Sequence, residues 1–312
     1  MEPTPQMSPS REAMLTAWAL WVDRLTAELA RAFDERGIAC LLLKGPAIAR
    51  WLYDDGAVRS YSDCDLLVSP DQIGAAQALL RERGFEDATS PMAHPRLESH
   101  EWRRAEDHVD LHSTLIGIRA DPRLVWAIVW PRSETELVAG TAVRVLDLAA
   151  RALHVALHAA QHGRDERKPL EDLRRALELV PQQTWLEVAA LAKRLQATEA
   201  FATGLRLSPS GVALAARLGL ASETSTDATL RLEPVPLALA FEHLASTQGC
   251  RARLRLVLRE LFPTAAFMRW WSPLARRGPV GLAAAYCWRP LWLLAHLGPG
   301  LLAWQRARRM TR

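Results

Sequence analysis

LLLKGPAIARWLY at residues 41–53 and SDCDLLV at residues 62–68 contain the clearest strand and helix signals in the chain. The first stretch continues an apolar run over residues 38–43, which is typical of a short buried strand. The run breaks at Gly45 and Pro46, where a short helix is expected to begin. The second stretch predicts another strand over its whole length, so strand and helix alternate in this part of the chain.

The flanking segments extend this pattern on both sides. Apolar residues at helical spacing predict a helix at about 12–36 and another at about 71–83, which ends at Gly84. Two polar, strand-like stretches follow at about 98–104 and 108–115. This order predicts an α+β fold, in which a mixed sheet is covered by helices on at least one face.

The second half of the chain has a helical pattern. Segments with helical periodicity lie at about 145–162, 169–180, 183–196, 208–219, 235–248 and 251–262. The Ser/Thr-rich residues 223–229 predict an exposed linker. With a boundary near Gly140, we expect four parts: an N-terminal tail and helix (1–36), an α/β core (37–140), an all-helical domain (141–265) and a Trp/Arg-rich helical tail (266–312).

The composition is that of a globular protein and is weak support for a nucleic-acid partner. The 312 residues are 49% hydrophobic and carry a net charge of +4, which arises almost entirely from arginine because Lys44, Lys168 and Lys193 are the only lysines. The four cysteines lie far apart and form no CxxC pair, which favours a reducing compartment. The start, MEPTPQMSPSREAM, lacks the basic and apolar regions of a signal peptide, so we expect a cytoplasmic protein.

Asp63 and Asp65 form the first group with catalytic potential. Alternate residues of a strand point to one face, so the two carboxylates are expected to project together, roughly 6–7 Å apart. Such a pair suits divalent ions that activate an attacking oxygen and neutralise a leaving pyrophosphate. Taken alone, an Asp-x-Asp pair is more simply read as two solvent-facing acids.

Asp110 is the second group, in HVDLHSTL at residues 108–115. On a strand, His108, Asp110 and His112 share one face. A carboxylate between apolar neighbours can be a third metal ligand, or the base that takes a proton from an acceptor hydroxyl. The competing reading is an antiparallel edge strand with one face in water.

His154, His158 and His162 recur every fourth residue and therefore lie along one stripe of a helix. A zinc site would need a third ligand or an H-E-x-x-H arrangement, which the sequence does not contain at this place. A polar stripe that lines a cleft or the surface is the simpler interpretation.

Taken together, these segments resemble the nucleotidyltransferase-like proteins of the polymerase-β superfamily. The similarity is to a poorly characterised bacterial branch with the pattern LLKG-x-A-x-A, then LY, an arginine, D-x-DLLV and V-[ED]-LH. This chain contains LLLKGPAIARWLY, Arg59, SDCDLLV and HVDLH in that order, and later LHVALHAAQHG and LEDLRRALEL. The resemblance covers about residues 38–180 and implies a nucleotidyltransferase-like sheet followed by a helical domain.

The resemblance also implies the residues of an active site. It implies that Asp63, Asp65 and Asp110 are the catalytic acids and hold Mg²⁺ or Mn²⁺. It implies that the NTP is held at the turn of Lys44 and Gly45, by residues ahead of the acids and by residues of the helical half, namely Arg59, Ser62, His158 and Asp172. The chain departs from the superfamily's usual Gly-Ser or Gly-Gly turn, because Pro46 removes a hydroxyl and one N–H donor.

The expected activity is transfer of a nucleoside monophosphate from an NTP to an unidentified acceptor, either a small molecule, a peptide or a protein. Pro46 leaves open a non-catalytic nucleotide-binding or scaffold protein that keeps the fold. A toxin-like transferase that acts on tRNA is a third reading. Nucleic acid is the less favoured partner, because outside the tail the arginines form no run interleaved with aromatic residues.

The tail at residues 266–312 combines five tryptophans with apolar residues and arginines. Arg289, Pro290 and Pro299 interrupt its apolar stretch, which disfavours a single membrane crossing. Flanking arginines fit a helix pair that associates peripherally with an anionic membrane or receives a protein partner. A tail that caps the helical domain is the simplest alternative.

Overall fold

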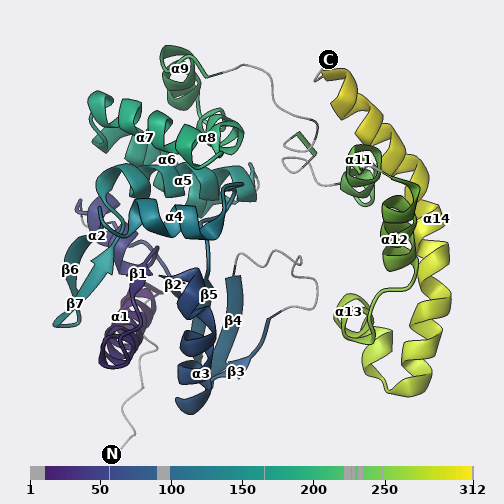
Figure 1. The fold of residues 1–312 in the computed structure, drawn as a ribbon, viewed down its shortest axis with the longest axis horizontal. Coiled ribbons are helices and arrows are strands. Elements are labelled where there is room, and N and C mark those ends of the chain that lie inside the picture. The colour runs from purple at the N-terminus through teal and green to yellow at the C-terminus, as the bar shows by residue number, and fades with distance from the viewer. Residues whose placement is uncertain are drawn as a thin grey trace, which may run out of the picture. The chain divides into compact units, whose positions relative to one another are not determined.

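A computed structural model gives the structure of residues 11–55, 57–89, 99–164, 166–220, 226, 229–230, 235–247 and 249–310 (Figure 1). Residues 1–10, residue 98 of the predicted strand and most of the predicted linker 223–229 lie outside these described residues. The chain divides into two compact units. The first contains Met1–Ala88, Leu97–Ala156 and Glu171–Ala197, and the second contains Thr89–Arg96, Leu157–Leu170 and Thr198–Arg312.

Seven strands in the described part of the chain form one mixed sheet in the order β3-β4-β5-β2-β1-β7-β6. The pairs β2–β5 and β1–β7 are parallel, and the other neighbours are antiparallel. The strands are β1 Cys40–Leu42, β2 Cys64–Val68, β3 Glu86–Asp87, β4 Ser99–Arg104, β5 Asp107–His112, β6 Glu134–Val138 and β7 Thr141–Val145. The prediction of a mixed sheet is confirmed.

Helices precede, connect and follow the strands. Those that accompany the sheet are α1 Arg11–Glu35, α2 Pro46–Leu52, α3 Ile73–Glu82 and α4 Pro122–Val129, with a 3₁₀ turn at Pro70–Gln72. Those that follow it are α5 Leu148–His162, α6 Arg167–Leu179, α7 Gln182–Arg194, α8 Thr198–Leu205 and α9 Pro209–Arg217. The C-terminal helices are α11 Ala238–Ser246, α12 Cys250–Leu261, α13 Ala265–Trp271 and α14 Pro279–Met310, with a 3₁₀ turn at Pro273–Arg276. The predicted helical second half is confirmed.

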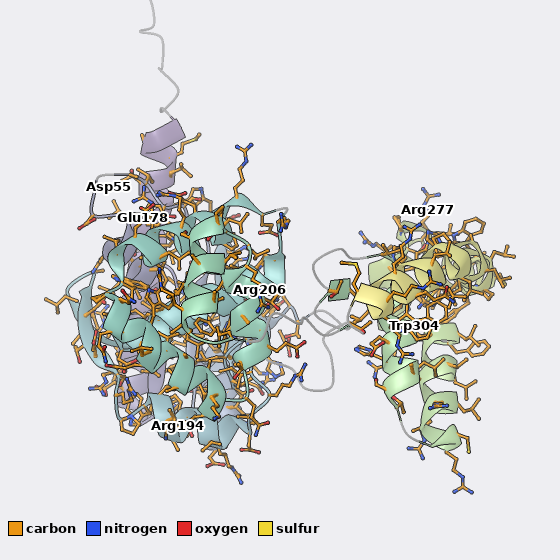
Figure 2. All side chains as sticks on the ribbon, turned by 90° about the horizontal axis from the view of Figure 1, so that it is seen from above. Asp55, Glu178, Arg194, Arg206, Arg277 and Trp304 are labelled. Atoms are coloured by element: carbon orange, nitrogen blue, oxygen red, sulfur yellow. The ribbon has the colours of Figure 1, made fainter. Side chains whose placement is uncertain are left out.

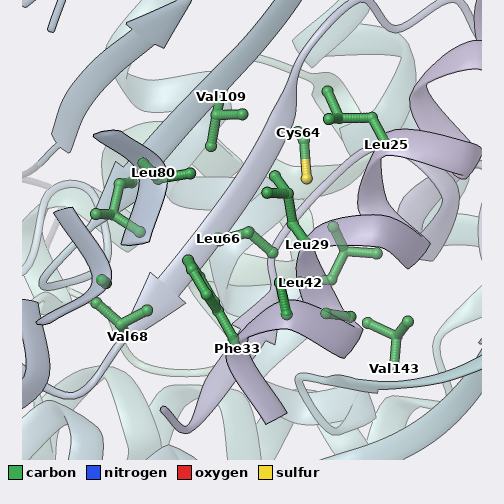
Figure 3. Packing of buried hydrophobic residues seen from close by; sticks show 14 of the residues in the cluster. Leu25, Leu29, Phe33, Leu42, Cys64, Leu66, Val68, Leu80, Val109 and Val143 are labelled. Atoms are coloured by element: carbon green, nitrogen blue, oxygen red, sulfur yellow. The ribbon is translucent and has the colours of Figure 1, made fainter. Parts of the chain in front are cut away.

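One face of the sheet is buried against α1 and α3. Leu29 and Phe33 of α1 pack with Cys64 and Leu66 of β2, and each of these side chains is fully buried (Figure 3). Successive residues of a strand point to opposite faces, so Asp65 projects from the face away from this cluster. Packing of the apolar neighbours therefore fixes the direction of the carboxylate.

The β6–β7 hairpin is the main element that the sequence did not predict. It turns at Ala139 and Gly140, which have φ of 46° and 76°, as a two-residue hairpin turn requires. Strand β7 then joins the sheet beside β1, where Leu42 pairs with Val145. Gly140, the expected boundary, thus lies within a hairpin of the sheet. The exposed faces of these short strands carry charged residues, which obscured the strand pattern.

Within the described residues, no helix is both long enough and apolar enough to cross a membrane. Helix α14 has 32 residues but contains Pro290 and Pro299 inside it.

Candidate active site

Asp65 and Asp110 lie opposite each other on neighbouring strands. Strand β2 pairs with β5 in parallel, and the register matches Asp65 with Asp110 and Leu67 with His112. Because alternate residues share a face, His112 projects to the same side as the two acids. One ligand atom from each of Asp65, Asp110 and His112 lies within 4.8 Å of the others, which brings three potential metal ligands together.

The apolar neighbours of these residues explain their orientation. Val109 and Leu111 flank Asp110, are fully buried and belong to the same cluster as Cys64 and Leu66. Both strands therefore turn their apolar side toward α1 and α3, and their polar side toward the opposite face of the sheet. This alternation, read from the sequence, places Asp110 on the face of Asp65 once the strands are neighbours.

Lys44 and His112 both contact one oxygen of Asp65. The Lys44 Nζ lies 2.6 Å from Asp65 Oδ1, and His112 Nε2 lies 3.2 Å from the same oxygen. The Asp65 side chain is 1% exposed. Burial alone would raise the pKa of this carboxyl, but the Lys44 charge and the hydrogen bond from His112 outweigh burial and hold the pKa of Asp65 well below its ordinary value. Asp65 is therefore ionised over the whole physiological range.

Asp110 shows the opposite behaviour. Burial and the neighbouring Asp65 charge raise the pKa of Asp110 from 3.8 to about 6, and Asp63 adds to the repulsion. Asp63 itself directly precedes β2 and is partly buried. It stands close enough to influence Asp110 and Lys44 electrostatically, but it is outside the close cluster of Asp65, Asp110 and His112.

The donor atoms of this cluster fit a divalent cation. Carboxylate oxygens are the ligands that Mg²⁺ and Mn²⁺ prefer, and an additional imidazole suits Mn²⁺ better than Mg²⁺. The repulsion that raises the pKa of Asp110 is relieved when a cation binds between the acids. His112 Nδ1 is buried and has no hydrogen-bond partner within the described residues. The cluster is therefore a candidate metal site.

The turn before α2 lies next to the acids. Gly45 has a φ of +58°, which favours glycine, and a Cβ at this position would contact Tyr61 at 3.6 Å and the carbonyl oxygen of Asp63 at 3.9 Å. Pro46 is the first residue of α2, where its missing N–H breaks no helical hydrogen bond. Ser62 is exposed just ahead of Asp63. The turn and the acids are therefore adjacent in space.

The structure pairs Arg59 and Asp172 with each other. Arg59 Nε and Nη2 donate to the carboxylate of Asp172 at 2.8–3.1 Å, and both side chains are 3% exposed. Tyr53 donates a further hydrogen bond of 2.7 Å to Asp172. This buried bidentate pair ties the segment between α2 and β2 to α6.

The three histidines along α5 have different surroundings. His158 is buried, and its ring contacts His162 edge to face at 4.5 Å. His154, one turn earlier, is 2% exposed, and burial together with the Lys44 charge lowers the pKa of His154 to about 3. His154 therefore lies within the electrostatic reach of Lys44 and Asp65 and is neutral at pH 7.

Sequence reasoning singled out neither His112 nor His154 as part of the site. The signal for His112 was present, because it shares the Asp110 face of β5. No comparable signal separated His154 from the other two histidines of its stripe, since their spacing along the helix is identical.

The chain is similar to known proteins over part of its length. A search of curated proteins gave no match. Two solved structures of the antibiotic-resistance factor ANT(2'')-Ia are similar in part. The solution structure has 21% identity and a TM-score of 0.42, over 59% of this chain and 95% of that one. The crystal structure with adenylyl-2''-tobramycin has 20% identity and a TM-score of 0.40, over 55% and 97%.

A nucleotidyltransferase-like protein from Paracoccidioides brasiliensis has 15% identity and a TM-score of 0.34, over 56% of this chain and 92% of that one. The model of a family described as uncharacterised nucleotidyltransferase matches residues 10–210. This match confirms the resemblance that the motifs indicated. Because the matched region is well over half of the sequence, the chain belongs to this family of nucleotidyltransferases.

Proposed function

We propose that this enzyme transfers a nucleoside monophosphate from an NTP to an acceptor in a reaction that requires a divalent metal ion. The observation that carries the proposal is the register of β2 and β5, which sets Asp65 opposite Asp110. Their carboxylates and His112 converge within 4.8 Å on one face of the sheet. Acids that share a small volume repel one another, and a cation that both can bind removes this repulsion.

We propose that Asp65 and Asp110 hold the ion and that Asp63, at the start of β2, completes its coordination. When bound, Mg²⁺ or Mn²⁺ supplies Lewis-acid polarisation of the phosphoryl oxygens and neutralises charge on the leaving pyrophosphate. In this proposal Asp110 is also the base that takes the proton of an acceptor hydroxyl.

The segment around α2 supplies the remaining groups of the proposal. Lys44 is held near the acids by Asp65, from where its ammonium is available to a phosphate oxygen. Gly45 gives the turn its positive φ, and Ser62 is exposed beside Asp63. In this scheme Arg59 and Asp172 act by fixing the segment that carries Ser62 and Asp63, since each satisfies the other's charge. His158 stays a candidate for the nucleotide side of the site. The acceptor is a small molecule, a peptide or a protein.

The test is transfer of label from NTPs labelled at the α-phosphate. Purified protein is incubated with each NTP, Mg²⁺ or Mn²⁺ and a cell extract that supplies acceptors. We expect label in an acceptor only when metal is present. Asp65→Asn and Asp110→Asn are each expected to reduce transfer by about a hundredfold or more, because the loss of a metal ligand removes several kcal/mol of transition-state stabilisation.

Asp71→Asn is the matched control, because Asp71 is exposed and forms a surface ion pair with Arg123. This variant should transfer label like the parent. The proposal fails if no NTP gives metal-dependent transfer, or if Asp65→Asn keeps full activity.

Pro46 favours one second candidate, a nucleotide-binding protein without catalysis. Proline at the first position of α2 offers no N–H to a phosphate. Calorimetry separates the two functions. A scaffold binds NTP equally well with and without metal, whereas the proposed enzyme binds NTP much more tightly when Mg²⁺ or Mn²⁺ is present.

A further inference from the structure

Helix α14 presents an apolar surface over most of its length. Between Pro279 and Leu302, no exposed residue carries a charge, an amide or a hydroxyl. Six large side chains of this surface are between 41% and 83% exposed, namely Val280, Trp288, Leu291, Leu294, Leu297 and Leu302. At 1.5 Å per residue the surface extends for about 36 Å. We call these six side chains the apolar face of α14.

The side of α14 that packs against its own unit carries mainly small residues, unlike the buried side of an ordinary helix. Its buried positions include four small residues, Gly281, Ala285, Gly300 and Ala307. A Cβ on Gly300 would lie 2.6 Å from the carbonyl oxygen of Pro236, and a Cβ on Gly281 would collide with Leu274. A helix of a self-contained domain buries its large apolar residues. In α14 small residues face its own unit and most of the large ones face outward.

The one charged residue between Pro279 and Leu302 is withdrawn from this surface. Arg289 is 3% exposed, and its Nε donates to the carbonyl oxygen of Glu260 at 2.7 Å. Its guanidinium also lies over the rings of Phe267 and Trp271, at 4.6 and 5.1 Å from their centres. The charge is therefore satisfied on the packed side, and the apolar face is uninterrupted.

The same part of the chain is strongly basic. Residues 249–312 contain twelve arginines and one acidic residue, whereas residues 1–248 contain 27 basic and 34 acidic residues. On α12, Arg251, Arg255 and Arg259 are spaced by four residues and all are exposed, so they form one basic stripe. The positive charge of the whole protein is thus concentrated in its C-terminal helices.

Arginines also bracket the apolar face. Arg276 and Arg277 are exposed immediately before α14, and Arg306 and Arg309 are exposed in its last turns. Figure 2 labels Arg277 and Trp304 among the side chains of the C-terminal helices. A face of leucine and tryptophan with arginines at both ends is compatible with a helix that lies in a lipid interface.

We propose that α12–α14 bind the surface of a membrane that contains anionic lipids. In this arrangement the apolar face of α14 enters the boundary between headgroups and acyl chains, and exposed arginines at both ends of α14 and on α12 are available to lipid phosphates and carboxylates. In this proposal α14 lies along the membrane surface, in agreement with Pro290 and Pro299 inside the helix.

The apolar face and the excess of arginine together favour an anionic membrane over other partners. A nucleic acid would satisfy the arginines but would leave the long apolar face in water. A second copy of the chain could cover the apolar face, but it would bring an equal excess of arginine against the first. An anionic bilayer satisfies both the charge and the apolar surface.

The test is flotation of the full chain with lipid vesicles. Vesicles of phosphatidylcholine with about 30% phosphatidylserine are compared with vesicles of phosphatidylcholine alone. We expect binding to the anionic vesicles that weakens at least tenfold without phosphatidylserine or when salt is raised to about 0.5 M, where charges are screened within a few ångströms.

Two sets of variants separate the contributions. The apolar variant combines Leu291→Ser, Leu294→Ser and Leu297→Ser and should reduce vesicle binding at least tenfold. Its control combines the same change at three exposed leucines elsewhere, Leu124→Ser, Leu137→Ser and Leu186→Ser, and should bind vesicles like the parent. Arg251→Gln, Arg255→Gln and Arg259→Gln together should also reduce binding. The matched control changes three exposed arginines of the remaining chain, as Arg24→Gln, Arg194→Gln and Arg217→Gln.

Circular dichroism verifies that each variant keeps its helical content, so that loss of binding is not loss of folding. The proposal is overturned if the chain does not float with anionic vesicles, or if the apolar variants float like the parent. A dimer that the leucine variants dissociate would assign the face to a second copy. Binding to DNA or RNA without binding to vesicles would assign the arginines to nucleic acid. Either result would also overturn it.

Discussion

The ammonium nitrogen of Lys44 lies 2.6 Å from Oδ1 of Asp65, the oxygen that His112 also contacts. A cation bound between Asp65 and Asp110 would share this oxygen with Lys44. Lysine and metal ion are therefore expected to compete for Asp65, and the ion pair balances the charge of the carboxylate when no metal is bound.

This competition predicts the behaviour of Lys44→Met. Without metal, the variant should lose about 2–4 kcal/mol of stability, because Asp65 becomes a buried charge without a cationic partner. Added Mn²⁺ should raise the melting temperature of the variant more than that of the parent, since no lysine has to be displaced. Thermal unfolding with and without Mn²⁺ measures both effects. Lys193→Met, an exposed lysine, is the control. Equal Mn²⁺ shifts in parent and Lys44→Met would contradict the competition.

The Arg59–Asp172 pair should be important for stability rather than for metal binding. Arg59→Met or Asp172→Asn alone should cost about 3–5 kcal/mol, because each leaves one buried charge unpaired. The double variant should cost much less than the sum of the two single changes. Urea unfolding of the four proteins gives the coupling free energy. Additive losses would show that the two side chains do not stabilise each other.

Asp110 gives a pH dependence whose sign follows from its raised pKa. Between pH 3.8 and about 6 the folded protein binds a proton that the unfolded chain releases, so this group stabilises the fold as pH falls from 7 toward 4. Above pH 6 the ionised carboxylate destabilises the metal-free protein. Asp110→Asn should therefore be more stable than the parent at pH 7 by about 1–3 kcal/mol, and this difference should shrink toward pH 4. Chemical unfolding across this range is the measurement. A difference that is independent of pH would refute the assignment.

His154 is expected to destabilise the folded protein as the pH falls, opposite to Asp110. The pKa of His154 is lowered from 6.5 to about 3. Between these two pH values the unfolded chain takes up a proton that the folded protein excludes. Stability from this group is complete above pH 6.5 and is lost by about 1.4 kcal/mol per pH unit as pH falls. His154→Gln should flatten the loss of stability between pH 6.5 and 4, as measured by unfolding at several pH values. His162, two helical turns further along α5 and partly exposed, supplies the comparison variant His162→Gln. An unchanged slope in His154→Gln would contradict the burial of a neutral imidazole.

Local patterns in the sequence predicted most of the elements and the direction of the acids. Asp65 and Asp110 each have apolar neighbours on both sides. Because side chains alternate between the two faces of a strand, these neighbours predicted that each carboxylate points away from the core face. Helical spacing likewise predicted the second half of the chain. The β6–β7 hairpin escaped prediction because short strands with charged outer faces resemble connecting segments until a sheet edge is present to pair with them.

By itself, the sequence determined that the chain has strands with apolar residues on one face and acidic residues on the other. It also determined that helices and a basic, tryptophan-rich end follow these strands. Only the tertiary structure decided that β5 lies beside β2 in the register that matches Asp110 with Asp65, that Lys44 meets Asp65, and that Arg59 meets Asp172 across 113 positions. The physical reason is the range of the interactions. Periodicity and turns depend on neighbours a few residues apart, whereas strand register and buried ion pairs arise from contacts between distant segments, which exist only once the whole core has packed.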